Sequence, residues 1–355
     1  MLSFLSVFSK IGNVWNAVWP YLVAVLVFVF VIFIHEFGHF ISAKLLGVRV
    51  NEFAIGFGPA LFKKQGKETL YVIRAVPFGG YCAMEGEDET SEDEKAFCNK
   101  KAWKRFIIIV AGAFMNLVLG LILVMLTLAP ADRYITTMIH SFHTEDAVSQ
   151  SSGLMAGDRI VEINGRDIYS INDLSYCLTN VEGNTLDMKV VRDGKRQELQ
   201  VKFNTDTFEG INYVDIDFYL DSEPKTFSSF VRQSFTRTVS YARVVWFSLI
   251  DLITGKYGIS AMSGPVGVTA VIGSVAKRGI LDLLPMLALI TVNLGVFNLL
   301  PVPALDGGRA FFLLIEMIIR RPIPKKFEGA VHTAGLILLL GFIAVITVKD
   351  IIWLF

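Results

Sequence analysis

His35, Glu36 and His39 form an HExxH sequence inside an apolar stretch of the chain. On a helix, two histidines four positions apart lie on one face, where their ring nitrogens can bind a single Zn²⁺ ion. Zinc lowers the pKa of a water molecule at an open coordination position, and a neighbouring carboxylate can accept the proton. The spacing therefore predicts a hydrolytic zinc site in which Glu36 is the general base.

An alternative is that these histidines hydrogen-bond each other or line a proton path, the ordinary interpretation of an isolated intramembrane histidine. Here, however, two histidines and a carboxylate lie within five residues. A charged residue at the centre of a membrane span costs on the order of 2.5 kcal/mol or more, so a metal ion or a polar partner is expected. This cost favours the zinc interpretation.

A third protein ligand is needed, and Asp306 is the best candidate. It lies in the segment 298–308 (NLLPVPALDGG), whose prolines and glycines interrupt an apolar helix. Interrupted backbone at membrane depth usually lines a cavity. In a soluble protein the same Leu-Asp-Gly would be a helix cap or a turn, but the unfilled zinc position favours a ligand.

Two amide side chains of the same region, Asn293 and Asn298, could bind the backbone of an unwound substrate, because unpaired amides are costly in a membrane. Hydrogen bonds between helices explain them equally well.

Gly112, Asn116 and Gly120 recur every four residues, which predicts a face of small residues for close helix packing.

The elements that must position these residues are membrane-spanning helices, because 53% of the 355 residues are hydrophobic. About twenty apolar residues suffice to cross the hydrocarbon core as a helix. Four segments do so: residues 21–46, 106–129, 281–300 and 334–355. The first is longer than a signal-peptide core and has no cleavage site of small residues, so we expect it to be retained.

Two further features of the composition limit the interpretation. The 33 basic and 33 acidic residues balance, which gives no indication of nucleic acid as a partner. Cys82, Cys98 and Cys177 lie far apart, which argues against a disulfide framework and against a thiolate zinc site.

The loop charges predict the orientation of the spans. Basic residues gather within 48–105 and again within 320–326, so both loops are expected in the cytoplasm and the region 132–220 outside. The fourteen residues from Tyr21 to Ile34, at about 1.5 Å each, place His35 roughly 21 Å into a core about 30 Å thick. The zinc site is therefore expected near the cytoplasmic face.

The regions outside the spans have patterns of their own. Alternating apolar residues on either side of residues 192–195 predict a β-hairpin in the external domain. Residues 68–76 alternate as a strand does, whereas the acidic run 85–94 is expected to be solvated and without chemistry. Residues 227–253 have apolar residues at helical spacing mixed with arginines, which favours a helix lying on the membrane surface.

Together, HExxH in the first span, LDG in a later span and a translocated domain between them resemble the site-2 protease family of intramembrane zinc metalloproteases, in particular the bacterial regulator of sigma-E protease type. The resemblance covers nearly the whole chain. It implies that His35, His39 and Asp306 are the zinc ligands and that Glu36 is the catalytic acid and base, in agreement with the spacing argument.

Three further segments take part in this resemblance. Gly79, Gly80 and Tyr81 are similar to the family's membrane-associated β-hairpin loop, which implies an edge strand presented to the substrate. The segment 152–165 (SGLMAGDRIVEING) is similar to a bacterial PDZ signature, and the chain has room for one such domain. The stretch 263–267 (SGPVG) matches a family motif and is expected to be a turn at the membrane surface.

We therefore expect a multi-span α-helical membrane protein with four transmembrane helices, a membrane-associated β-hairpin and one small α+β PDZ-like domain. Residues 1–130 and 223–355 form the two halves of the protease core, and residues 131–222 form the periplasmic domain. The expected activity is zinc-dependent endopeptidase cleavage of single-span membrane proteins in the bacterial inner membrane, for example an anti-sigma factor or a remnant signal peptide. A monomer is favoured.

Two other functions compete with this one. In a membrane adaptor, PDZ binding would be the function and the zinc site would be structural, but an intact Glu36 beside both histidines speaks against it. In a metal or proton transporter, His35, Glu36, His39 and Asp306 would form a relay across the bilayer. Their clustering at one depth disfavours a relay.

Overall fold

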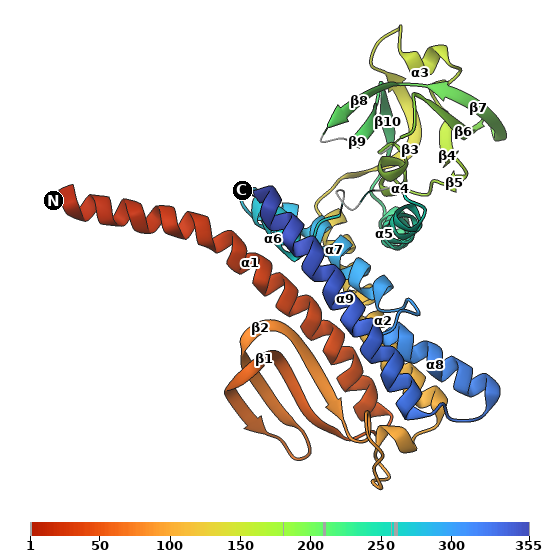
Figure 1. The fold of residues 1–355 in the computed structure, drawn as a ribbon. Helices are drawn as coiled ribbons and strands as arrows, with labels where there is room; N and C mark the ends of the chain where they lie inside the picture. Colours follow the sequence, from red (N-terminus) through yellow and green to blue (C-terminus); the bar gives the residue numbers. More distant parts are fainter. Residues whose placement is uncertain (1, 180, 209–210, 257, 259–261, 355) are drawn as a thin grey trace. The chain divides into compact units, whose positions relative to one another are not determined.

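The structure is a computed structural model that describes every residue except 1, 180, 209–210, 257, 259–261 and 355. It divides into two compact units, one formed by residues 1–120 with 251–355 and the other by residues 121–250 (Figure 1). The helices α2 (Ala102–Leu128) and α5 (Phe227–Ile253) cross the limits between the units.

The first unit is mostly helical. Its elements are α1 (Leu2–Leu45), β1 (Val50–Gln65), β2 (Leu70–Met84), the short 3₁₀ helix η1 (Phe97–Asn99), most of α2, α6 (Pro265–Ala276), α7 (Ile280–Phe297), α8 (Asp306–Ile319) and α9 (Lys325–Leu354). Apolar side chains of α1, α6 and α7 pack around Ala24 and Ile272. A second apolar cluster joins the end of α1 to the β-strands, α2 and α8, and includes Phe53, Ile109 and Leu313.

Three helices among the described residues are long and apolar enough to cross a membrane: Val18–Leu45, Ala102–Leu128 and Lys325–Ile352. They include three of the four predicted spans. The remaining one corresponds to α7, whose 18 residues extend about 27 Å, slightly less than a hydrocarbon core of about 30 Å. The helix α7 ends at Phe297, so the prolines that follow interrupt the apolar segment as predicted.

The helix α6 departs from the turn expected at residues 263–267. Gly264 is its N-cap and Pro265 its first residue, a position that proline favours. The Asp350 carboxylate of α9 accepts a hydrogen bond from the Gly267 N–H at 2.8 Å. A carboxylate in the first turn stabilises the exposed N–H groups of a helix. Because it comes from 83 residues away, local sequence patterns do not reveal it.

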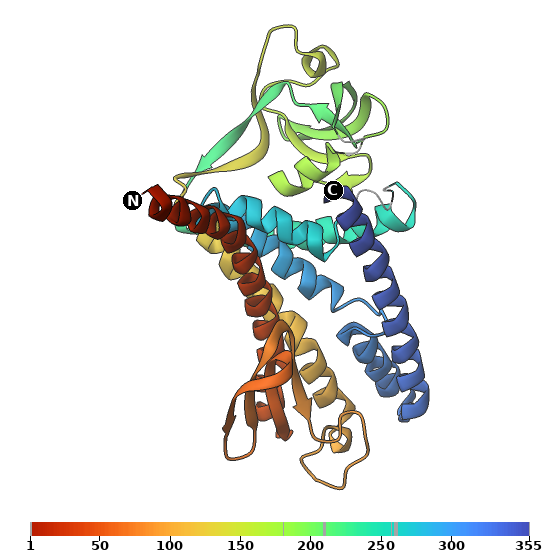
Figure 2. The same cartoon turned by 60° about the vertical axis from the view of Figure 1, so that its left-hand side comes forward.

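The strands β1 and β2 form a bent sheet beside the second half of α1 (Figure 2). The first part of β1 is internal, because Ala54 pairs with both Val72 and Tyr81 of β2. The predicted strand 68–76 is therefore found as part of β2. The last part of β2, Gly80–Met84, has its partners only in β1 among the described residues.

The second unit is built around an antiparallel sheet of order β10-β3-β4-β6-β7, with β5 paired to β4 and a separate β8-β9 hairpin. Its elements are β3 (Arg133–Phe142), α3 (Val148–Ser151), β4 (Arg159–Ile163), β5 (Arg166–Asp167), α4 (Ile171–Cys177), β6 (Thr185–Arg192), β7 (Lys195–Lys202), β8 (Asn204–Phe208), β9 (Ile211–Asp215), β10 (Phe218–Pro224) and most of α5.

The predicted hairpin is confirmed, because β6 and β7 pair through the register Arg192 to Lys195. Leu186, Met188 and Val190 alternate into the core and are almost fully buried. Gly153 and Gly165 have φ values of +108° and +76°, a conformation that glycine adopts readily in tight turns.

The helix α5 lies where a surface helix was predicted. One of its faces packs on the strands and loops of the second unit. Ser170 Oγ donates a hydrogen bond to Ser240 Oγ at 2.8 Å, and the Arg243 guanidinium lies over the Tyr169 ring at 4.2 Å. Another face of α5 carries exposed apolar side chains, among them Phe235 and Trp246. The structure therefore groups α5 with the preceding β-strands rather than with the C-terminal helices.

Candidate metal centre

Three side chains from distant parts of the chain meet in the first unit. His35 and His39 come from successive turns of α1, and Asp306 is the first residue of α8. Asp306 Oδ2 lies 3.0 Å from His35 Nε2 and 3.1 Å from His39 Nε2, and the two Nε2 atoms are 3.2 Å apart. Both histidines are buried. The predicted convergence of the three residues is therefore present in the structure.

This geometry fits a zinc ion. Ligand atoms about 2.0–2.1 Å from a tetrahedral zinc ion stand about 3.3–3.4 Å from one another. The three measured separations, 3.0, 3.1 and 3.2 Å, are close to that value. Two imidazole nitrogens and one carboxylate oxygen are a donor set that zinc accepts, and they leave one coordination position for water.

The second ring nitrogen of each histidine, Nδ1, points away from the cluster and also has a partner. His39 Nδ1 is 2.9 Å from the Ile108 carbonyl oxygen. A carbonyl oxygen only accepts, so the proton of a neutral His39 ring is on Nδ1 and the lone pair of Nε2 faces the cluster.

His35 Nδ1 lies 3.3 Å from the amide of Asn116, a fully buried residue whose Oδ1 has no hydrogen-bond partner. The two orientations of an amide have nearly the same shape. Turned by 180°, the amide accepts a hydrogen bond from His35 Nδ1–H, which satisfies Oδ1 and leaves the lone pair of His35 Nε2 facing the cluster.

Glycines allow α1 and α2 to approach each other at the cluster. A Cβ added at Gly38 would lie 2.4 Å from the Ala111 carbonyl oxygen, and one added at Gly112 would lie 2.3 Å from His39 Nε2. Real Cβ atoms do not approach other atoms so closely. The predicted small-residue face of α2 therefore packs closely, and Gly112 also leaves room for the imidazoles.

The loop between α7 and α8 delivers Asp306 to the histidines. A Cβ at Gly307 would lie 2.1 Å from the Leu300 carbonyl oxygen, and one at Gly308 would lie 2.5 Å from that of Val302. The glycine pair thus lets α8 begin directly against the preceding loop. The Ala304 N–H donates a hydrogen bond to His332 Nδ1 of α9 at 3.0 Å, which ties the same loop to another helix.

Comparisons with known proteins agree with this geometry. The family model described as "Peptidase family M50" matches residues 23–342. The chain belongs to peptidase family M50. The resemblance to site-2 proteases is therefore confirmed, and the protein is a zinc-dependent metalloprotease associated with the membrane through its apolar helices.

The similarity to individual relatives extends over nearly the whole length of both chains. The chain is 38% identical to a candidate zinc metalloprotease of Clostridium perfringens, over 93% of this chain and 98% of the relative. It is 30% identical to the regulator of sigma-W protease RasP of Bacillus subtilis, with the same two coverages. It is 28% identical to the zinc metalloprotease RasP of Geobacillus kaustophilus, over 92% of this chain and 96% of the relative.

In this M50 peptidase Glu36 lies between the two histidines in sequence, next to the last part of β2. A Cβ placed on Gly80 would stand 3.3 Å from Glu36 Cγ and 2.9 Å from the Ala54 carbonyl oxygen. The Glu36 carboxylate is also close to the backbone of Cys82 in the same strand. The carboxylate therefore lies beside the strand that the family resemblance expects to contact substrate.

The remaining residues predicted to bind substrate lie in different environments. Gly79 has a φ of +91° and packs against Phe57, where no side chain would fit. The Tyr81 hydroxyl donates to Glu52 Oε1 at 2.7 Å. Asn293 Oδ1 is buried without a partner, and Asn298 is buried at the end of α7. No hydrogen bond between described residues joins Asn293 or Asn298 to the three donor atoms.

Three residues near the site were not singled out by sequence reasoning for the role that the structure suggests. Asn116 was interpreted as part of a packing face, and His332 and Arg309 were not considered. The only local signal for Asn116 was a buried amide in an apolar span, which is costly without a partner.

The acidic run 85–94 was expected to be solvated, but one part of it forms ion pairs with α8. Glu87 is mostly buried and forms an ion pair with Arg309 of α8, and Asp88 Oδ1 lies 3.0 Å from the same guanidinium. The correction has a simple cause, because the compensating charge lies more than 200 residues away in the sequence.

Proposed function

We propose that this M50 peptidase is an intramembrane endopeptidase whose zinc ion is held by His35, His39 and Asp306, with Glu36 as the general base. The observation that carries the proposal is the convergence of the three donor atoms within 3.0–3.2 Å of one another, two of them on buried histidines. When bound, zinc supplies an activated water molecule and polarises the peptide carbonyl.

The protein's own residues would divide the remaining work. The Glu36 carboxylate accepts the proton of the attacking water and delivers it to the leaving amine, as a positioned general base and acid does. The strand that contains Gly80 packs against Glu36 and would position that carboxylate. Asn116 and the Ile108 carbonyl oxygen hold the two imidazoles with their Nε2 lone pairs turned inward.

The substrate class we propose is a single-span membrane protein, such as an anti-sigma factor or a remnant signal peptide. One relative is named a regulator of sigma-W protease. A transmembrane helix must unwind before a protease can reach its peptide bonds. Among the described residues the segment Gly80–Met84 pairs with β1 alone, and its Gly80 lies beside Glu36, which suits the addition of an extended substrate strand. The unpartnered Asn293 amide oxygen could accept a hydrogen bond from the unwound backbone.

The orientation proposed for the chain in the membrane follows from its loop charges. We propose four spans that include α7, with the basic loops and the zinc site on the cytoplasmic side of the bacterial inner membrane. The β-strand unit would be an external PDZ-like domain that filters substrates. The exposed apolar side of α5, which includes Phe235, Val239 and Trp246, would rest on the membrane surface. A monomer remains the favoured state.

Cleavage of a tagged single-span substrate by the detergent-purified protein tests the proposal. We expect cleavage by the wild type, none by Glu36→Gln with zinc still bound, and none after a zinc chelator. Asp306→Asn should lose zinc affinity as well as activity. Wild type that binds zinc but cleaves none of several substrates would favour the adaptor function. Metal transport by the same protein in liposomes would favour the relay.

A further inference from the structure

The inner face of α8 contacts the N-terminal half of the first unit at successive turns. Asp306 meets the histidines, and Arg309 follows one turn later and forms ion pairs with Glu87 and Asp88. Leu313 packs in the apolar cluster that contains Ile109 of α2. Further along α8, Glu316 forms an ion pair with Arg105 of α2. Two ion pairs thus hold α8 in place. The helix provides the cation, Arg309, to the first pair and the anion, Glu316, to the second.

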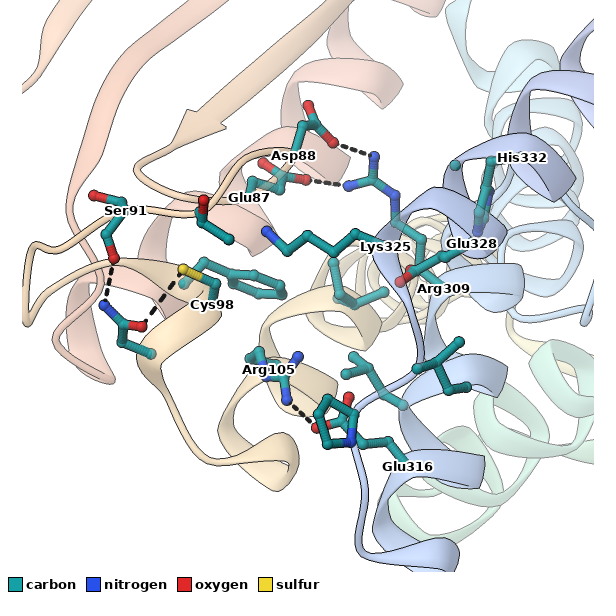
Figure 3. A pocket seen from close by; sticks show the side chains of 18 residues that line it. Glu87, Asp88, Ser91, Cys98, Arg105, Arg309, Glu316, Lys325, Glu328 and His332 are labelled. Carbon is teal, nitrogen blue, oxygen red and sulfur yellow. Dashed lines mark hydrogen bonds and ion pairs between the residues drawn. The ribbon is translucent and has the colours of Figure 1, made fainter.

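Figure 3 shows the Arg309 guanidinium reaching toward both Glu87 and Asp88, with the Arg105 and Glu316 pair separate from it in the same cavity. Glu87 comes shortly after β2, the strand whose Gly80 lies beside Glu36. The acidic segment therefore connects the strand beside Glu36 to the helix that carries Asp306.

We propose that Arg309, held by Glu87 and Asp88, is a positioning residue for Asp306. The ion pairs would fix the rotation and height of the first turn of α8, so that the Asp306 carboxylate meets both imidazoles. This inference rests on the proposed zinc site, because it concerns how one of its ligands is placed. Arg309 would act through Asp306, because its own ion pairs are with Glu87 and Asp88.

Two features make a local anchor necessary. The helix α8 begins after a loop, residues 298–305, that contains no regular secondary structure, and its N-cap Leu305 provides no side-chain hydrogen bond. The Arg309 Cα lies three residues from that of Asp306, about 4.5 Å along the helix axis, whereas Glu316 lies about 15 Å away. An ion pair at Arg309 therefore restrains the ligand directly, and one at Glu316 restrains mainly the far end of α8.

The surroundings allow a selective test. A cavity of about 480 Å³ borders Arg309, Glu328 and His332, so a shorter or uncharged side chain at position 309 is accommodated without a clash. The pair formed by Arg105 and Glu316 joins α2 to the same helix, and each of its side chains is 16% exposed. It is the matched control, because its loss weakens the attachment of α8 without acting on the first turn.

The experiment measures zinc affinity of the full-length protein in detergent, by competition with a chromogenic chelator, together with the visible spectrum of the cobalt-substituted protein. We expect Arg309→Met to lower zinc affinity about 10- to 100-fold and to alter the cobalt spectrum. Arg105→Met should lower the unfolding temperature at least as much but leave both metal readouts near wild type. The exchanged pair Glu87→Arg with Arg309→Glu should recover much of the affinity.

Three results would overturn the inference, and they can be told apart. If Arg309→Met binds zinc like wild type while Asp306→Asn does not, the zinc site stands and the positioning role fails. If Arg105→Met reduces zinc affinity as much as Arg309→Met does, the effect is a general loosening of α8. If Asp306→Asn binds zinc like wild type, the proposed ligand set is itself wrong.

Discussion

Gly112 of α2 lies so close to His39 of α1 that an added Cβ would stand 2.3 Å from the Nε2 atom of the imidazole. The same Cβ would lie 2.9 Å from His35 Cε1. The absence of a side chain on one helix is therefore a condition for both rings of the neighbouring helix to face Asp306.

Replacing Gly112 with alanine should displace the histidine rings and reduce the zinc content of the purified protein. Gly120→Ala is the matched control on the same helix, because its Cβ would meet Val292 Cγ2 at 2.4 Å and no histidine. We expect Gly120→Ala to lower the unfolding temperature but to retain zinc. Full zinc content in Gly112→Ala would contradict the packing argument.

Asn116→Leu keeps the approximate size of the side chain but removes the hydrogen bond to His35. Because partners of the outer imidazole nitrogen orient metal-binding histidines, zinc affinity should fall about 10- to 100-fold. The control is Asn293→Leu, which removes another inward amide that has no hydrogen bond to the donor atoms. This second variant should bind zinc normally and cleave the single-span substrate more slowly. Equal zinc affinities of Asn116→Leu and wild type would sink the assignment of Asn116.

Ala304 has a φ of +76°, a left-handed conformation that favours glycine, and its N–H is bound to His332 Nδ1 at 3.0 Å. His332→Ala leaves this N–H without its acceptor, which should cost about 1–3 kcal/mol of unfolding free energy. Ala304→Gly relieves the strained backbone and should recover part of the loss, by about 1 kcal/mol. Thermal unfolding of the two single variants and the double variant measures both effects. A further loss of stability in the double variant would contradict this account of the loop.

Glu68 connects the β1–β2 turn to the end of α1. The Lys44 ammonium, followed by that of Lys95, holds the pKa of this carboxyl at about 2, below its ordinary value of 4.5. A depressed pKa means that the stabilisation is complete above pH 4.5 and is lost as the pH falls toward 2.

Glu68→Gln should therefore lower the free energy of unfolding at pH 7, by up to about 1 kcal/mol because the pair is partly exposed. The difference between the variant and the wild type should shrink steadily below pH 4.5. Unfolding temperatures measured from pH 7 to pH 3 test this expectation. A constant difference over the whole range would argue that the lost contact is not electrostatic.

Much of the fold follows from periodicity. The apolar runs predicted helices at four places, and α1, α2, α7 and α9 are found there, three of them long and apolar enough to cross a membrane. The alternation of Leu186, Met188 and Val190 predicted a strand whose inner face is buried. Both patterns repeat over many residues, so each prediction rests on several independent positions. The helix α6 was missed because its N-terminus depends on Asp350, a single contact between segments far apart in the sequence.

The chemistry proposed for this protein could be predicted from short stretches of sequence. His35, Glu36 and His39 lie within five residues of one helix, so their relative placement depends only on helix geometry. Asp306 could be proposed because a zinc site lacks a ligand without it, and because prolines and glycines interrupt the backbone there.

How the residues of the site come together could not be predicted from local sequence. The approach of Asp306 to the histidines, the contact of Asn116 with His35 and the pairing of Arg309 with Glu87 join residues 81 to 271 positions apart. Such contacts depend on how helices pack, through small steric features such as Gly38 against Gly112. The recurrence of Gly112, Asn116 and Gly120 predicted a face for close packing but not its partner, because each contact is made once and by residues that local patterns do not link.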